Sequence, residues 1–204
     1  MTLRVAIASE YDLYDGEIYR FLLEKILAQP VERWVGDYSF TGNRSVVKLA
    51  PAFLATAARV GIRHAVLAVD NDGGAKRRPE HDEGHAPAPF DIDDDVRCRE
   101  CWLTASIPAR WSTLGGMTCV VVPVQVVETW LLCVRGDEFP REPERAFDRR
   151  ALKTRFFGKP MPPVSTRIEM AIELLSAPHA MGALRKRPSY LRFEKRAVAW
   201  KSAR

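Results

Sequence analysis

The sequence predicts an α/β fold in which a mostly parallel β-sheet is flanked by helices. Apolar segments typical of strands alternate along the chain with amphipathic segments typical of helices. The strand segments are almost continuously apolar, as expected for strands that are buried on both faces of a sheet. The chain has 204 residues, of which 47% are hydrophobic, so it can bury the core of one such domain.

The first predicted elements are a strand, a helix and a weaker strand. The strand is Leu3 to Ser9, an apolar run that contains β-branched residues. The helix runs from about residue 16 to residue 28, with Asp15 as its N-cap and Pro30 after its end. Residues 31–35 form the second strand.

A second helix and two further strands follow. The helix begins at Asn43 or Ser45, carries a regularly spaced apolar face and ends at Gly61. Residues 65–70 and 118–124 are the two strands, because both are short runs dominated by aliphatic side chains. The order of these elements is that of repeated strand–helix units, which favours parallel pairing.

The last predicted strand leads into the C-terminal part of the chain. Pro123 indicates that this strand lies at a sheet edge or ends there, since proline cannot donate a ladder hydrogen bond. Residues 125–135 are a buried helix or a turn leading into one. We therefore predict an α/β domain over residues 1–135, with a loop insertion at about 73–102. Residues 136–204 form a basic, mainly helical C-terminal extension packed on that domain.

Charge is distributed unevenly between the two ends of the chain. Residues 151–204 contain 12 basic and 3 acidic residues, a net charge of +9, whereas residues 1–150 contain 19 basic and 23 acidic residues, a net charge of −4. This asymmetry fits an anionic partner such as nucleic acid that is gripped by one part of the chain and processed by the other. A basic helix face that is merely solvated is the alternative.

Carboxylates follow three of the predicted strands. Glu10 comes directly after the first strand, Asp70 and Asp72 end the third in the segment "LAVDNDGG", and Glu128 follows the fourth. Because the carboxyl ends of parallel strands meet at one edge of the sheet, these side chains should gather there. A hard cation would hold such a cluster ionised, and oxygen ligands without histidine favour Mg²⁺, Mn²⁺ or Ca²⁺.

These segments, in this order, resemble the Toprim (topoisomerase–primase) domain. "IASEYD" is similar to the segment with that family's first Glu, although Tyr11 stands where a Gly is common, and "LAVDNDGG" resembles its Asp-x-Asp motif. "VPVQVVETWLL" and "PSYLRF" are similar to segments of uncharacterised Toprim-like proteins related to the overcoming-lysogenization-defect nucleases. The resemblance implies a Rossmann-like sheet. Either Asp15 or Glu17 would be the second acid of the first motif.

The resemblance also implies Mg²⁺-dependent chemistry on phosphodiester bonds. Glu10 would be a general acid/base or a metal ligand, and Asp70, Asp72 and Glu128 would complete the metal-binding acidic cluster. Hydrolysis of DNA or RNA is the expected activity, with a protein partner in a phage-defence system as a further expectation. The alternatives are a non-catalytic nucleic-acid-binding or regulatory module and, less favoured, a nucleotide-sugar transferase that uses Asp-x-Asp to bind a diphosphate.

A second set of ligand-type residues lies in the predicted insertion. Two histidines four residues apart are followed after twelve residues by a Cys-x₂-Cys pair: His81, His85, Cys98 and Cys101. This is the ligand set of a structural Zn²⁺ site, with the histidines first. The intervening segment is rich in Pro and Asp and cannot pack a core, so a metal that links its two ends would stabilise it. A loop with solvated histidines is the alternative.

The C-terminal residues have an amphipathic basic pattern. Their apolar stripe predicts a helix docked on the sheet. On the outer face we expect contacts to a phosphate backbone from Arg185, Lys186, Arg187, Arg192, Lys195 and Arg196.

The location predicted from the sequence is the cytoplasm. No apolar run reaches the length of a membrane span, and the first residues do not resemble a signal peptide. The four cysteines are therefore expected to be reduced, with Cys119 and Cys133 as core residues.

Overall fold

The computed structural model describes residues 2–71, 81, 98–123, 126–137 and 149–202. Its centre is a four-stranded parallel sheet with the strand order β2-β1-β3-β4, so the predicted α/β fold is confirmed. The strands are β1 (Leu3–Ser9), β2 (Val31–Trp34), β3 (His64–Ala68) and β4 (Met117–Val121). β4 lies at an edge, as Pro123 predicted.

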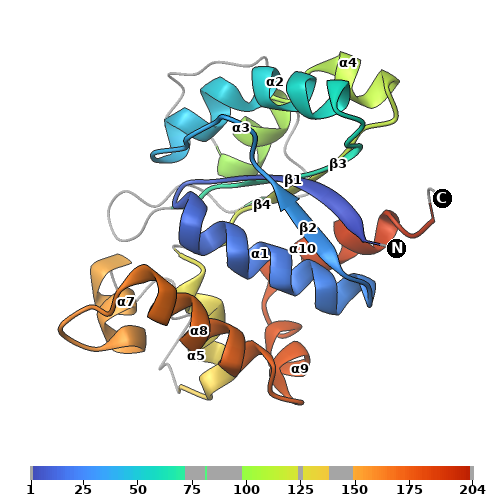
Figure 1. Cartoon of the computed structure of the whole chain (residues 1–204). Coiled ribbons are helices and arrows are strands. Elements are labelled where there is room, and N and C mark those ends of the chain that lie inside the picture. Colours follow the sequence, from blue (N-terminus) through green and yellow to red (C-terminus); the bar gives the residue numbers. More distant parts are fainter. Residues whose placement is uncertain (1, 72–80, 82–97, 124–125, 138–148, 203–204) are drawn as a thin grey trace.

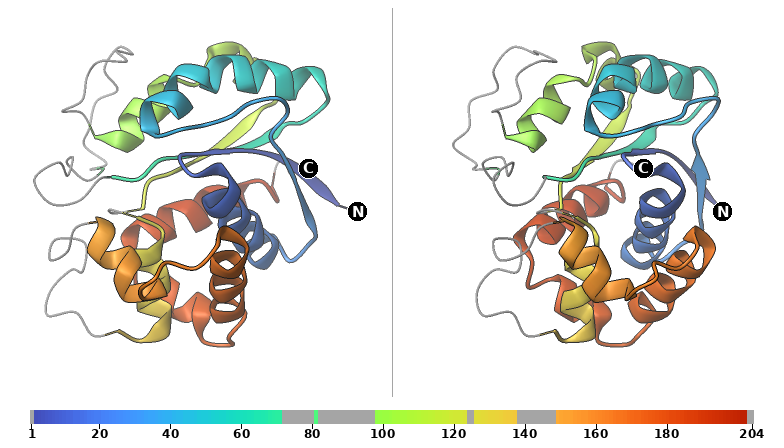
Figure 2. Two further views of the ribbon diagram at one scale, coloured as in Figure 1. Left: turned by 60° about the vertical axis from the view of Figure 1, so that its left-hand side comes forward. Right: turned by 90° about the vertical axis from the view of Figure 1, so that its left-hand side faces the viewer.

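Helices cover both faces of the sheet (Figure 1). One face is covered by α2 (Asn43–Arg59), α3 (Arg99–Ala105) and α4 (Ala109–Thr113). The helices on the other face are α1 (Asp12–Leu27), α5 (Glu128–Arg135), α7 (Arg149–Phe157), α8 (Val164–Leu175), α9 (Ala180–Leu184) and α10 (Pro188–Ala199). Figure 2 shows the sheet between these two groups from the side.

The alternation of side chains along β1 explains why the strand is apolar throughout. Val5 and Ile7 belong to the core beneath α1, whereas Ala6 and Ala8 belong to the core beneath α2. All four are fully buried. A strand that is covered on both faces has no solvent-exposed side, so its sequence lacks the alternation of polar and apolar residues.

The N-cap prediction for α1 is wrong. The helix begins at Asp12 rather than at about residue 16, and the backbone N–H of Asp15 already donates to the carbonyl of Tyr11 at 2.9 Å. Asp15 is therefore inside the first turn, and its side chain is buried. A short polar side chain that looks like a cap in the sequence is instead held in the interior, close to other acids.

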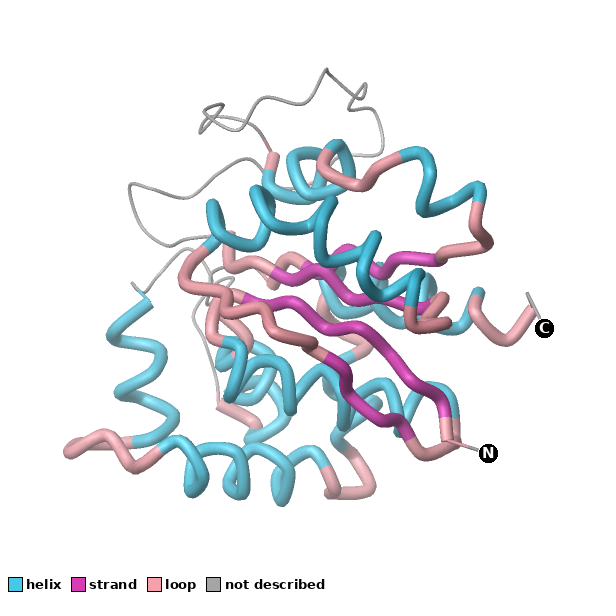
Figure 3. Tube along the Cα trace, turned by 45° about the horizontal axis from the view of Figure 1, so that its top comes forward, coloured by secondary structure: helices cyan, strands magenta, loops and turns pink. Residues whose placement is uncertain are grey.

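The C-terminal extension shares a core with the α/β domain. Leu152, Leu184, Tyr190 and Phe193 lie in one apolar cluster with Ile7 of β1. α10 packs against β4 and α1, as its apolar stripe predicted. Figure 3 shows the four strands side by side between the helices. Among the residues described here, no helix combines the length and the apolar character needed to cross a bilayer.

The sheet order contains a topological switch point. From β1 the chain moves to β2 on one side, and it then crosses to β3 on the other side of β1. The helices that follow β1 and β3 lie on opposite faces, so the order of the strands reverses between these two strands. Ligands of open α/β sheets bind at this kind of switch point.

Candidate functional site

Glu10 and Asp70 meet across the switch point. Glu10 directly follows β1, and Asp70 comes two residues after the end of β3. Glu10 Oε1 accepts a hydrogen bond from the backbone N–H of Asp70 at 2.9 Å. Both side chains are buried. The bond fixes the first of the predicted carboxylates to the start of the Asp-x-Asp segment.

Two further carboxylates belong to the same buried region. Glu128 is the first residue of α5 and is 0% exposed, and Asp15 points inward from α1. Glu128 and Glu10 both act electrostatically on Asp15, which shows that the side chains are close. We call Glu10, Asp15, Asp70 and Glu128 the acidic cluster. Asp72 lies outside the described residues.

The sequence left open whether Asp15 or Glu17 joins the other acids, and the structure places Asp15 among them. Glu17 forms ion pairs with Arg20 at 2.7 Å and with Arg33 at 3.3 Å. Its charge is therefore compensated on the outer side of α1.

Burial and mutual repulsion raise the pKa of three members of the acidic cluster. Burial raises the pKa of Asp15 to about 7, with Glu128 and Glu10 adding to the shift. The pKa of Asp70 is raised well above its usual value, first by burial and then by Glu10 and Asp15. Burial also raises the pKa of Glu128. The cluster therefore takes up protons readily unless another cation compensates its charge.

Glu128 has unused ligand capacity. Neither of its carboxylate oxygens accepts a hydrogen bond from another described residue. The Lys153 ammonium lies near it, with Nζ 3.9 Å from Oε1. A fully buried carboxylate with this little compensation is costly, because buried polar groups normally have partners.

Two basic residues of α7 face the acidic cluster, and the sequence interpretation missed them. Arg149 Nη1 lies 3.7 Å from Glu10 Oε2, and Arg149 Nη2 lies 3.4 Å from Asp70 Oδ2. Lys153, one helical turn later, reaches Glu128. The spacing of four residues puts both cations on one helix face, which is the only sign of them in the sequence.

A cavity of about 430 Å³ opens beside the acidic cluster. This volume is within the range of small-molecule sites. Its wall includes Tyr11, a residue that is 46% exposed. The lining residues are Glu10, Tyr11, Leu13, Ser39, Phe40, Thr41, Gly42, Arg149 and Val164.

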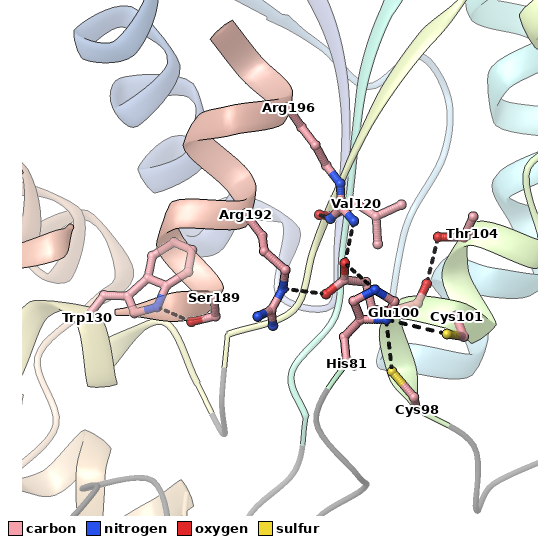
Figure 4. Close-up of polar contacts among 10 residues, drawn as sticks. All are labelled: His81, Cys98, Glu100, Cys101, Thr104, Val120, Trp130, Ser189, Arg192 and Arg196. Carbon is pink, nitrogen blue, oxygen red and sulfur yellow. Dashed lines mark hydrogen bonds and ion pairs between the residues drawn. The ribbon is translucent and has the colours of Figure 1, made fainter. Parts of the chain in front are cut away.

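A second group of ligand-type residues lies on the side of α3. His81 Nδ1 is 3.8 Å from Cys98 Sγ and 3.5 Å from Cys101 Sγ. The three ligand atoms are close enough together to hold one metal ion such as zinc. Figure 4 shows both sulfur atoms facing the imidazole ring. His85, the predicted fourth ligand, lies outside the described residues.

The predicted nucleic-acid-binding residues of the tail have different surroundings. Arg192 and Arg196 both form ion pairs with the buried Glu100 of α3, which the sequence did not predict. Arg185 pairs with Glu194 at 2.8 Å. Of the remaining three, Lys186 and Lys195 are exposed, and Arg187 is half-buried.

Comparison with known proteins adds no family to this geometry. No protein-family model matches the chain, and no curated protein or solved structure matches it significantly. The structure therefore establishes an α/β domain with a four-stranded parallel sheet. Any assignment of function rests on the sites themselves.

Proposed function

We propose that this protein hydrolyses phosphodiester bonds of nucleic acid with Mg²⁺ or Mn²⁺ held by the acidic cluster. The observation that carries the proposal is the set of buried carboxylates at the switch point, in which both Glu128 oxygens lack a hydrogen-bond partner among the other described residues. The resemblance of the surrounding segments to Toprim domains supports the same activity.

The donor set fits a hard divalent cation. All four members of the acidic cluster offer carboxylate oxygens, the ligands that Mg²⁺ and Mn²⁺ prefer. Glu10 Oε1 accepts the Asp70 N–H, and Glu10 Oε2 already faces a cation, Arg149 Nη1 at 3.7 Å. When bound, the metal would neutralise charge on the phosphodiester and lower the pKa of an attacking water.

The surrounding residues supply the other requirements of the reaction. Glu10 can accept a proton from the attacking water, because it lies at the border between the buried cluster and the cavity. Arg149 also lines this cavity and can contact a phosphate. The exposed Tyr11 ring offers a surface on which a base can stack.

Cleavage of labelled DNA and RNA, single-stranded and duplex, tests the proposal. We expect cleavage with Mn²⁺ or Mg²⁺, and a loss of at least about a hundredfold in Glu10→Gln and in Asp70→Asn, because each variant removes a charged oxygen from the reacting centre. The matched control is Glu173→Gln, which changes an exposed acid on α8 and should cleave normally.

Three results would contradict this function. The first is cleavage that persists in both variants, since it would come from another site or another protein. The second is a wild-type protein that binds no divalent cation at the acidic cluster. The third is cation-dependent binding of nucleic acid without cleavage, which would favour the non-catalytic module.

Removing the α7 cations should weaken nucleic-acid binding. In Arg149→Ala/Lys153→Ala, measured without divalent cation, the slope of log affinity against log salt should flatten by about 0.9 per lost duplex phosphate contact. The matched control is Arg4→Ala. It removes a cation of β1 that pairs with Glu32 of β2, away from the cluster. An unchanged slope in the double variant would mean that the α7 cations do not contact nucleic acid and only compensate the charge of the acidic cluster.

The proposed contact of the tail with nucleic acid has a separate test. Lys186→Ala/Lys195→Ala removes two exposed cations of the C-terminal residues. The same flattening of the salt slope is expected there, and equal weakening for all sequences, because phosphate contacts position a ligand without reading it. If the double variant has the same slope as the wild type, these lysines do not contact nucleic acid, and α10 is only a helix docked on the sheet.

A further inference from the structure

The separations within the group formed by His81, Cys98 and Cys101 match a tetrahedral metal site. With Zn–S near 2.3 Å and Zn–N near 2.0–2.1 Å, ligands at the tetrahedral angle place N and S about 3.6 Å apart. The two observed separations are 3.5 and 3.8 Å. Both separations therefore agree with one shared ion, and all three ligand atoms lie within 4.8 Å of one another.

Glu100 lies on the far side of the same imidazole. His81 Nε2 is 3.8 Å from Glu100 Oε1, which is longer than a hydrogen bond but close enough for electrostatic attraction. A neutral His that binds a metal through Nδ1 carries its proton on Nε2, so the N–H dipole would point toward this carboxylate. A carboxylate that faces the N–H of a metal-bound His fixes the tautomer and the orientation of the ring.

Glu100 also connects α3 to the C-terminal helix. Arg192 Nε donates to Glu100 Oε2 at 2.9 Å, and Arg196 forms an ion pair with Oε1. Arg196 Nη1 also donates to the carbonyl of Val120 in β4 at 2.6 Å. Figure 4 shows the resulting chain of contacts from the two cysteines through His81 and Glu100 to α10.

We propose that Zn²⁺ binds His81, Cys98 and Cys101 and, through Glu100, holds α10 against the edge strand β4. Two thiolates neutralise the charge of one Zn²⁺, so Glu100 remains free to compensate the two arginines. Cys98 is the N-cap of α3, and Cys101 lies in its first turn, so metal binding fixes the turn that carries Glu100. This role does not depend on nuclease activity.

Metal binding is tested first. Protein purified with a thiol reductant should contain one zinc per chain, and the zinc should be absent in Cys98→Ser and in Cys101→Ser. Co²⁺ substituted at the site should show thiolate-to-metal charge-transfer absorption that is lost in the same variants. Zinc-free wild-type protein that also fails to bind added Zn²⁺ or Co²⁺ would overturn the site.

The role of Glu100 is tested by a conservative variant. Glu100→Gln should keep a stoichiometry of one zinc but bind it about 10- to 100-fold more weakly, because the carboxylate behind His81 is lost. Glu194→Gln is the matched control, since it removes an acid of α10 that pairs with Arg185. Equal zinc affinity in both variants would overturn the positioning role.

Hydrogen exchange tests the connection to α10. Removing zinc from the wild-type protein with a chelator should raise amide exchange in α10 about tenfold, because Glu100 pairs with two arginines of α10. Exchange in α8, the internal control, should keep its rate. In Glu100→Gln, chelation should change α10 much less, because the connection is already broken. Exchange of α10 that is insensitive to zinc would overturn the coupling.

Discussion

Metal-free protein should lose stability as the pH rises from about 4 to about 7. Asp15 has its pKa raised from 3.8 to about 7 in the folded protein, so between these values the folded state holds a proton that the unfolded state has released. The free energy of unfolding then falls with pH, by up to about 4 kcal/mol for a shift of this size. Burial of Asp70 and Glu128 acts in the same direction.

Urea unfolding at several pH values, with and without Mn²⁺, measures this effect. Asp15→Asn is the matched variant, because it keeps the shape of the side chain but cannot ionise. It should be more stable than the wild type at pH 8 in the absence of metal and close to it at pH 4. A divalent cation should stabilise the wild type more at pH 8 than at pH 5.5, since it competes with protons for the carboxylates.

The comparison between variants separates this effect from other titrations. Removal of zinc from the thiolates also depends on pH, but it is common to the wild type and Asp15→Asn. The difference between the two proteins therefore reports on the acidic cluster. The same pH dependence in both would show that Asp15 is not held with a raised pKa, and Mn²⁺ that never stabilises would argue against a cation site.

The sequence predicted the sheet and the position of the first acids well, for physical reasons that are local. A parallel strand buried on both faces is apolar throughout, so β1 was found with its observed bounds. The carboxyl ends of such strands share one edge, which is why Glu10 and Asp70 are predicted to meet there, as they do.

Other parts of the site depend on packing between distant segments. Arg149 and Lys153 reach the acidic cluster only because α7 packs beside α5. Arg192 and Arg196 look like a solvated basic face in the sequence, but they meet a buried acid more than 90 residues earlier. Charge and periodicity give the face of a helix on which a residue lies, and they leave open what that face contacts.

Replacing Trp130 by Ala should cost about 3–5 kcal/mol of unfolding free energy, as expected for truncating a fully buried aromatic side chain. Trp130 is 1% exposed and lies in α5, two residues after Glu128. Its ring meets Tyr190 edge-on at 5.4 Å, and its Nε1–H donates to Ser189 Oγ at 3.0 Å. The side chain therefore joins the helix that carries Glu128 to the start of α10.

Two milder variants show how much of this free-energy cost comes from the hydrogen bond and how much any truncation on α10 would cost. Ser189→Ala leaves the buried indole N–H without its acceptor and should cost about 1–3 kcal/mol. Leu191→Ala, on the same helix but 44% exposed, is the control and should change the free energy of unfolding by less than about 0.5 kcal/mol. Urea unfolding measures all three, and a Trp130→Ala cost no larger than that of Leu191→Ala would contradict the packing described.

Cation affinity provides a second measurement on the same variants. Because α5 places Glu128 at the buried edge of the sheet, the cavity left in Trp130→Ala should let this helix shift and weaken Mn²⁺ binding at the acidic cluster. Ser189→Ala keeps the indole in place and should bind Mn²⁺ nearly as the wild type does. Unchanged Mn²⁺ affinity in folded Trp130→Ala would mean that Glu128 is positioned by other contacts, such as the Lys153 ion pair.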